Sequence, residues 1–187
     1  MRYTFRVTAV VLSAALCLSS AHAMDLERQE SCLALMKERV SAVGSREWGL
    51  LVDRARKYVM ECESVETTKG IALALGDIAL GLVRLERYAD AIPVATRCIR
   101  YEPDNSLCLL NLGIALNRTK SHDKARISLQ RVIDIGGYDT LTASLVEVAK
   151  QELGLVKFMS KVAASEQPEA PRAGDPESEQ YVSVAIA

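Results

Sequence analysis

The sequence predicts an all-α fold, a short right-handed solenoid of helix-turn-helix repeats closed by a C-terminal capping helix. The main observation is that the chain between Ile71 and Gly137 resembles itself at a spacing of 34 residues, a period typical of helical repeats. Apolar residues within each copy follow the period of an amphipathic helix. The composition agrees, because the 187 residues are 49% hydrophobic and 25% charged, as in ordinary soluble globular proteins.

Residues 1–23 precede the repeats and are interpreted as an export signal. Arg2 and Arg6 come before a mostly apolar run, Val7 to Leu18, and small residues end the segment where we expect cleavage. The run is too short to span a bilayer. Cys17 follows Ala14-Ala15-Leu16, in which the leucine and the small residues are not placed as expected before a lipidated cysteine. We therefore predict a soluble exported protein without membrane insertion after cleavage, periplasmic, with secretion as the alternative.

The charge of the mature chain argues against nucleic-acid partners. The full chain carries 23 basic and 24 acidic side chains. Loss of Arg2 and Arg6 leaves 21 against 24, a formal net charge of −3. A chain with this balance has no electrostatic attraction for nucleic acid or for an anionic membrane surface.

Residues 24–71 are predicted to form a degenerate N-terminal helical hairpin. Within them, Trp48 and four following residues align with the second helix of the next unit, which begins near Tyr88. This alignment requires six extra residues, 66–71, which would lengthen a loop or extend a helix. The other aligned residues are Leu51, Ala55, Tyr58 and Val59, which correspond to Ala91, Ala95, Cys98 and Ile99.

Residues 72–139 contain the two clearest repeats. Each is predicted to have a first helix, a polar turn at Glu86-Arg87 or Lys120-Ser121, and a second helix that begins near Tyr88 or His122. Pro103 and Asp104 end one unit and open the next. The matching pairs, with small residues where helices approach, are Leu75 with Leu109, Ile78 with Leu112, Ala79 with Gly113, Leu82 with Leu116, Ala91 with Ala125 and Ile99 with Ile133.

The C-terminal part is predicted to be a capping helix, residues 140–164, followed by a disordered acidic tail, residues 165–187. Asp139 is expected to cap a helix from Thr140 to about Leu153, with Gly154 near its end and a short continuation through Lys161. The tail is rich in proline and acidic residues, and its last seven residues either fray or dock on a partner.

These repeats resemble the tetratricopeptide repeat (TPR) family. The resemblance rests on Asn111-Leu112-Gly113 with Ala125 in one unit, and on Tyr88, Ala91 and Pro103 in the other. The chain departs from the family pattern where Leu75 and Leu109 replace the usual tryptophan and where Gly137 replaces the closing proline. The resemblance implies a stack of about three units whose first helices line a concave groove.

Four cysteines of the mature chain are predicted to form two disulfides, because an exported protein meets an oxidising compartment. Four cysteines allow three pairings. Repeat geometry places Cys32 and Cys62 at the same end of one hairpin, and Cys98 and Cys108 on either side of the turn around Pro103. We therefore predict Cys32–Cys62 and Cys98–Cys108. The alternative for Cys98 is a buried core thiol.

The sequence shows no catalytic, metal or cofactor motif, and we predict that the protein is not an enzyme. The only mature histidine, His122, stands at the start of a predicted helix instead of beside a nucleophile. No spacing suggests zinc ligands, and no glycine-rich phosphate loop is present. Glu61, Glu63 and Glu66 cluster at a helix end, where a solvated charged face is the better interpretation.

The resemblance implies a partner-binding groove for a protein or peptide, an apolar trough with Arg84 and Arg118 at one edge, suited to an apolar or acidic segment. It does not match the lysine- and asparagine-rich clamp that family members use for a terminal carboxylate, because Gly76 and Leu80 occupy the equivalent places. By analogy with exported members of the family, the resemblance implies a scaffold for assembly of an envelope or secretion complex. The alternative is a self-associating structural protein whose groove is buried in a homodimer. The predicted groove residues are Leu73, Leu80, Val83, Arg84, Leu107, Leu110, Ile114, Asn117 and Arg118.

Overall fold

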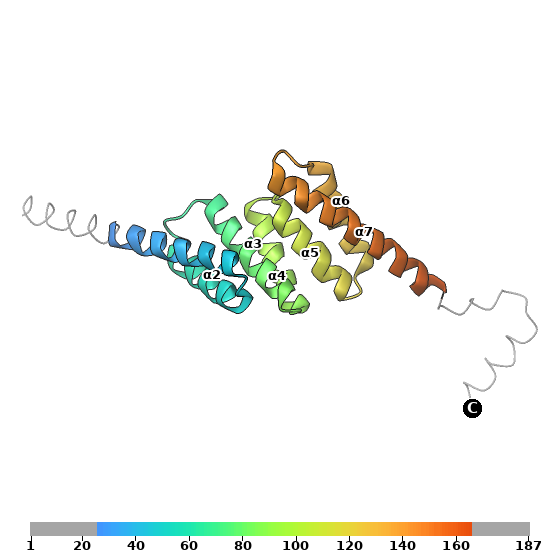
Figure 1. Ribbon diagram of the computed structural model, residues 1–187, viewed down its shortest axis with the longest axis horizontal. Helices are drawn as coiled ribbons and strands as arrows, with labels where there is room; N and C mark the ends of the chain where they lie inside the picture. Colours follow the sequence, from blue (N-terminus) through green and yellow to red (C-terminus); the bar gives the residue numbers. More distant parts are fainter. Residues whose placement is uncertain (1–25, 166–187) are drawn as a thin grey trace, which may run out of the picture.

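The computed structural model describes residues 26–165, which form helices joined by short turns, with no strand among them (Figure 1). The predicted export signal and all of the predicted acidic tail except Ser165, which ends the last helix, lie outside the described residues. The helices follow one another along the long axis of the molecule, with the N-terminal helix toward one end and α7 toward the other. The all-α fold predicted from the sequence is confirmed for this part of the chain.

Helices alternate between two roles, which we call first and second helices. The second helices begin at Trp48, Tyr88 and His122. Tyr88 and His122 are the helix starts predicted from the sequence, and Trp48 is the residue that the sequence aligned with Tyr88. The first helices are residues 26–45, α3 (Thr68–Arg84), α5 (Ser106–Arg118) and α7 (Thr140–Ser165), and the second helices are α2 (Trp48–Cys62), α4 (Tyr88–Tyr101) and α6 (His122–Ile135).

The turn inside each hairpin has one conformation, repeated three times. Arg46, Glu86 and Lys120 have positive φ angles of 58°, 59° and 63°. In the second and third hairpins the residue after the turn donates from its backbone N–H to a carbonyl five residues earlier, Arg87 to Leu82 and Ser121 to Leu116, both at 2.8 Å. These bonds satisfy carbonyls that the helix end would leave free. The backbone bonds hold the turn, so it forms without a glycine.

Glycines allow the paired helices to cross closely. A Cβ atom on Gly113 of α5 would lie 2.6 Å from Cγ of Leu129 on α6. A Cβ atom on Gly81 of α3 would lie 2.6 Å from Cγ2 of Val52 on α2. Atoms this close overlap, so a larger residue would push the helices apart. The small residues therefore set the distance between first and second helices.

Polar side chains begin the later first helices. The Thr67 hydroxyl accepts a hydrogen bond from the Gly70 N–H at 3.0 Å and caps α3, so that residues 68–71 of the extra segment extend this helix at its start. Asn105, next to the predicted Asp104, caps α5 by accepting from the Cys108 N–H at 3.0 Å. Asp139 accepts from the Thr142 N–H at 2.8 Å, at the predicted start of α7. Each bond satisfies an amide that has no partner within its helix.

The capping helix differs from the prediction in its length. α7 is one continuous helix of 26 residues, so Gly154 lies inside it and does not end it. Leu153 and Val156, on either side of Gly154, are buried in the core. Their burial keeps the helix continuous across Gly154. The free energy gained by packing these two side chains exceeds the modest cost of a glycine inside a helix. α7 then extends past the rest of the stack (Figure 1).

A buried polar network joins the first three helices. The guanidinium of Arg39, on the N-terminal helix, pairs with the Asp77 carboxylate on α3 and lies over the ring of Tyr58, 5.2 Å from its centroid. The Tyr58 hydroxyl donates to Glu66. Burial, with the hydrogen bond to Glu66, raises the pKa of Tyr58 to about 12. This network fixes the N-terminal hairpin against α3.

Candidate functional site

The first helices form one continuous face of the stack. α3 packs on α5 and α5 packs on α7, whereas within residues 26–165 no comparable contact joins α2 to α4 or α4 to α6. Helices that touch their equivalents lie on the inside of a curved array, and helices that diverge lie on the outside. The first helices therefore line the inner, concave face, where a repeat protein presents its binding surface.

Five of the predicted groove residues have accessible side chains on this face. Leu73 is 43% exposed, and Leu80, Val83, Leu107 and Ile114 are partly buried. Leu73 and Leu107 occupy equivalent places in their repeats, as do Leu80 and Ile114. Because equivalent residues of stacked repeats lie side by side, these four residues form two rows across α3 and α5.

Leu110 and Asn117, also predicted to line the groove, are instead buried. Leu110 is only 4% exposed and belongs to the core that includes Val146 and Ala149 of α7. Asn117 is 6% exposed, and its side-chain oxygen lies 3.0 Å from Nδ1 of His122, at the start of α6. The capping helix and the hairpin turn therefore occupy these two positions, and a partner does not reach them.

The two arginines predicted at the groove edge have intramolecular partners. Arg118 forms a two-armed ion pair with Glu152 of α7, with both N–O distances 3.1 Å. This hydrogen bonding raises the pKa of Arg118 further above its usual range. The guanidinium of Arg84 lies over the ring of Trp48, 5.6 Å from its centroid. Glu152 already neutralises the charge of Arg118, so this edge attracts acidic segments less than the sequence suggested.

The sequence analysis missed half of the aliphatic surface. The two repeat positions that Leu73 and Leu80 occupy on α3 are also aliphatic in the outer helices. They hold Leu33 and Val40 on the N-terminal helix, and Leu141 and Val148 on α7. These four side chains are between 40% and 72% exposed. The sequence could have identified them. The residues of the N-terminal helix lie 40 positions before their equivalents on α3, and those of α7 lie 34 positions after their equivalents on α5. We call the full set the aliphatic stripe: Leu33, Val40, Leu73, Leu80, Leu107, Ile114, Leu141 and Val148.

The projecting end of α7 prolongs this apolar surface. Leu155 follows Val148 by seven residues, two helical turns along the same face, and is 48% exposed. Phe158 and Met159 follow it and are likewise exposed. Large apolar side chains gathered on one exposed face mark interaction surfaces in soluble proteins.

The other features examined in the sequence have structural roles. His122 begins α6, as predicted. Hydrogen bonds from Tyr101 and Arg97 hold the pKa of Glu63 below its usual range, and a hydrogen bond from Tyr58 does the same for Glu66. Neither carboxyl is therefore tuned as a general acid.

Within residues 26–165 no three histidine, cysteine or acidic side chains are grouped to hold a metal ion. No helix in this part of the chain is long and apolar enough to cross a bilayer.

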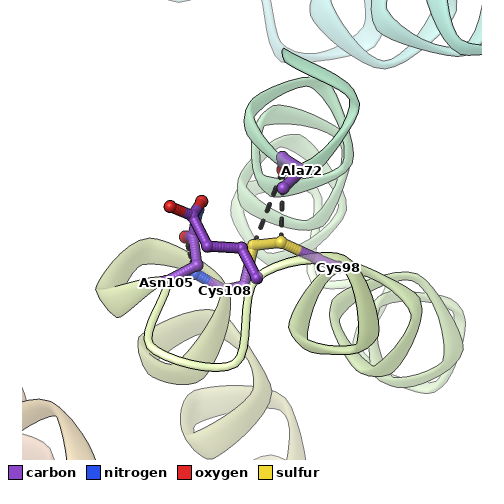
Figure 2. The surroundings of a disulfide bond; sticks show 5 residues. Ala72, Cys98, Asn105 and Cys108 are labelled. Carbon is purple, nitrogen blue, oxygen red and sulfur yellow. Dashed lines mark hydrogen bonds between the residues drawn. A yellow bond between two sulfur atoms is a disulfide. The ribbon is translucent and has the colours of Figure 1, made fainter. Parts of the chain in front are cut away.

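The cysteines lie in the two pairs predicted from the sequence. The Cα atoms of Cys32 and Cys62 are 5.8 Å apart, and those of Cys98 and Cys108 are 6.2 Å apart, both within the range of disulfides. The second pair joins α4 to α5 and lies against the carbonyl oxygen of Ala72 on α3 (Figure 2). All four side chains are buried. Each pair thus bridges two helices inside the core.

Comparisons with solved structures identify the fold as that of TPR domains. The TPR domain of Arabidopsis OM64 is similar with a TM-score of 0.58 at 12% identity, over 70% of this chain and 98% of that one. The Sgt2 TPR domain from Aspergillus fumigatus has a TM-score of 0.58 at 16% identity, over 80% and 93%. The first TPR of Spaghetti (RPAP3), bound to an HSP90 peptide, has a TM-score of 0.57 at 13% identity, over 70% and 93%. No protein-family model and no curated protein sequence matches the chain.

Proposed function

We propose that this TPR-fold protein is a non-catalytic interaction scaffold that binds an apolar segment of a protein partner along the aliphatic stripe. The observation that carries the proposal is the repetition itself. All four first helices place an aliphatic side chain at the same two positions, and five of these eight side chains are at least 40% exposed. A solvent-facing apolar surface repeated in every unit is costly to keep exposed and is explained by a partner that covers it.

The chemistry of the stripe favours an apolar segment over an acidic one. Its eight members carry no charge, and the nearby Arg118 is paired with Glu152. The HSP90 peptide bound to the RPAP3 domain ends in Glu-Glu-Val-Asp. Here Gly76 and Leu80 stand where the clamp of such receptors has its polar residues. We therefore propose a partner segment with aliphatic residues that pack between successive first helices.

We place this scaffold in the periplasm of a Gram-negative bacterium, after removal of residues 1–23, where it would support assembly of an envelope or secretion complex. The cysteine geometry supports the compartment, because two helix-bridging disulfides suit an oxidising environment. N-terminal sequencing of the protein from a periplasmic extract tests the location. A chain that begins at Met24 and carries no free thiol is the expected result, and an intact Met1 in the cytoplasm would contradict it.

The binding surface is tested by photocrosslinking in intact cells from single positions. A photoreactive residue at Leu73 or at Val148 should capture the same partner protein, because both positions lie on the stripe. The matched control is Ile127 on α6, which is an exposed aliphatic residue outside the stripe. Capture of the same protein from Ile127, or of unrelated proteins from Leu73 and Val148, would contradict a shared groove.

The projecting end of α7 favours self-association as a second candidate. Leu155, Phe158 and Met159 form an exposed apolar patch on a helix that extends past the stack, and such a patch on two copies can pair about a two-fold axis. Analytical ultracentrifugation of the purified chain distinguishes the two. A dimer that Phe158→Glu dissociates would support the second candidate, and a monomer at all concentrations would remove it.

A further inference from the structure

The outer face of the stack holds a cleft that the groove does not involve. It lies between α2 and α4, two second helices that diverge, and α3 forms its floor. Its volume of about 490 Å³ falls within the range of small-molecule sites. Most of its lining is apolar and includes Val59, Leu75, Ile78, Pro93 and Val94.

Three arginines surround this apolar floor. Arg56 comes from α2, and Arg97 and Arg100 come from α4. Arg97 pairs with Glu63 at 2.5 Å, but neither Arg56 nor Arg100 forms an ion pair within residues 26–165. Two guanidinium groups therefore face one apolar cleft without a carboxylate partner in the described part of the chain, and this arrangement complements an anion.

The flexible wall of the cleft adds to the case for a ligand with a hydrocarbon part. Met60 lines the cleft and is 82% exposed. An unbranched thioether side chain adapts its shape to different apolar ligands. A ligand that covered the apolar lining without an anionic group would desolvate the guanidinium groups without compensation.

We propose that this cleft binds a fatty-acid carboxylate, whose acyl chain lies on the floor of Val59, Leu75 and Ile78 and whose head group is bound by Arg56 and Arg100. The guanidinium fork matches a carboxylate with two parallel hydrogen bonds. The site is separate from the aliphatic stripe, since none of the residues that line the cleft belongs to the stripe. The proposed ligand site therefore does not depend on the scaffold function.

The test uses decanoate, below its critical micelle concentration, as the probe. Calorimetric titration into the mature full-length chain should give saturable binding of one molecule. Methyl NMR of the methionines locates it, because Met60 is in the cleft whereas Met159 is on the apolar face of α7. We expect a shift of the Met60 methyl signal and none at Met159. Shifts at Met159 without Met60, or no binding, would overturn the proposal.

Two controls test the chemistry of the head group. Decyltrimethylammonium has the same chain with a cationic head and should not saturate the site. The variant Arg56→Gln/Arg100→Gln should bind decanoate about tenfold more weakly, because it removes both charged donors. The matched control is Arg28→Gln/Arg126→Gln, which lowers the net charge equally outside the cleft. Equal binding of the cationic probe, or equal weakening by the two double variants, would show that the arginines do not recognise the ligand.

Discussion

Arg39 and Asp77 form an ion pair between the N-terminal helix and α3 that is largely removed from solvent, with side chains 8% and 16% exposed. Burial raises the pKa of Asp77, and the attraction of Arg39 opposes that rise. The Nε atom of Arg39 is buried without a hydrogen-bond partner. The pair thus specifies how the N-terminal hairpin docks, although burying its charges costs free energy.

Breaking the Arg39–Asp77 pair should destabilise the protein, whereas replacing both members should not. Asp77→Asn leaves a buried guanidinium without its counter-charge and should lower the free energy of unfolding by about 3 kcal/mol. The double variant Arg39→Met/Asp77→Leu should come within about 1 kcal/mol of the parent. Urea unfolding followed by circular dichroism measures both. A double variant as unstable as Asp77→Asn would mean that the ion pair stabilises the fold by more than the free energy that burying its charges costs.

The two cysteine pairs should contribute unequally to stability. The chain-entropy model assigns about 4 kcal/mol to a loop of the length between Cys32 and Cys62, and about 3 kcal/mol to the shorter loop between Cys98 and Cys108. Denaturant unfolding of the Cys32→Ala/Cys62→Ala and Cys98→Ala/Cys108→Ala variants compares them. Thiol titration of the denatured mature chain, which begins at Met24, should detect no free cysteine. Four reactive thiols would show that the pairs are not oxidised.

Two glycine-to-alanine substitutions should have opposite effects. Gly113→Ala places a methyl group against Leu129 and should cost about 2 kcal/mol. Gly154→Ala has no atom within 4 Å of the new Cβ and lies inside α7. It should stabilise the protein by about 0.5 to 1 kcal/mol, because alanine loses less backbone entropy in a helix. Thermal unfolding of both variants checks the signs, and a stabilising Gly113→Ala would refute the close crossing of α5 and α6.

Acidification should reveal the contribution of Glu66. Its pKa is lowered in the folded chain, chiefly by the Tyr58 hydrogen bond. A lowered pKa means stability that is present above the pKa of the unfolded chain, about 4.3, and lost as the pH falls through the folded value. The unfolding free energy should therefore fall less steeply below pH 4 in Glu66→Gln than in the parent. Urea melts from pH 7 to 3 measure this, with the exposed Glu30→Gln as the control that keeps the parental slope.

Charged substitutions should distinguish the exposed residues of the first helices from their buried residues. Leu110→Asp puts an unpaired carboxylate into the core against α7 and should cost more than about 3 kcal/mol. Leu73→Asp, on the exposed stripe, should change stability by about 1 kcal/mol or less. Circular dichroism with urea titration compares them. If Leu73→Asp also unfolds the protein, the stripe belongs to the core and offers no binding surface.

The helical register was predictable from the sequence because the turns repeat with the helices. Tyr88 and His122 begin α4 and α6 where the 34-residue spacing places them. The misassigned residues have a common cause. Sequence equivalence indicates which side of a helix a residue occupies, but not what packs over it. Leu110 occupies the same place as Gly76, yet the capping helix covers Leu110.

The same limit applies to Gly154 and to the second helices. A glycine within a polar turn ends a helix, but Gly154 lies between two buried residues that keep α7 in place. The outer cleft was also missed, because it depends on how far α2 and α4 diverge. That spacing results from the packing of α3 between them, and no single segment of the sequence encodes it.

The positions of the two cysteine pairs determine how the chain would respond to tension. With both bonds formed, a force applied at the two ends of the molecule bypasses the residues between Cys32 and Cys62, and likewise those between Cys98 and Cys108. Residues 33–61 and 99–107 would then carry no load while the remaining helices extend. A scaffold pulled by its partners would lengthen by unfolding helices between and after the two bonds, and the N-terminal hairpin would remain a closed covalent ring.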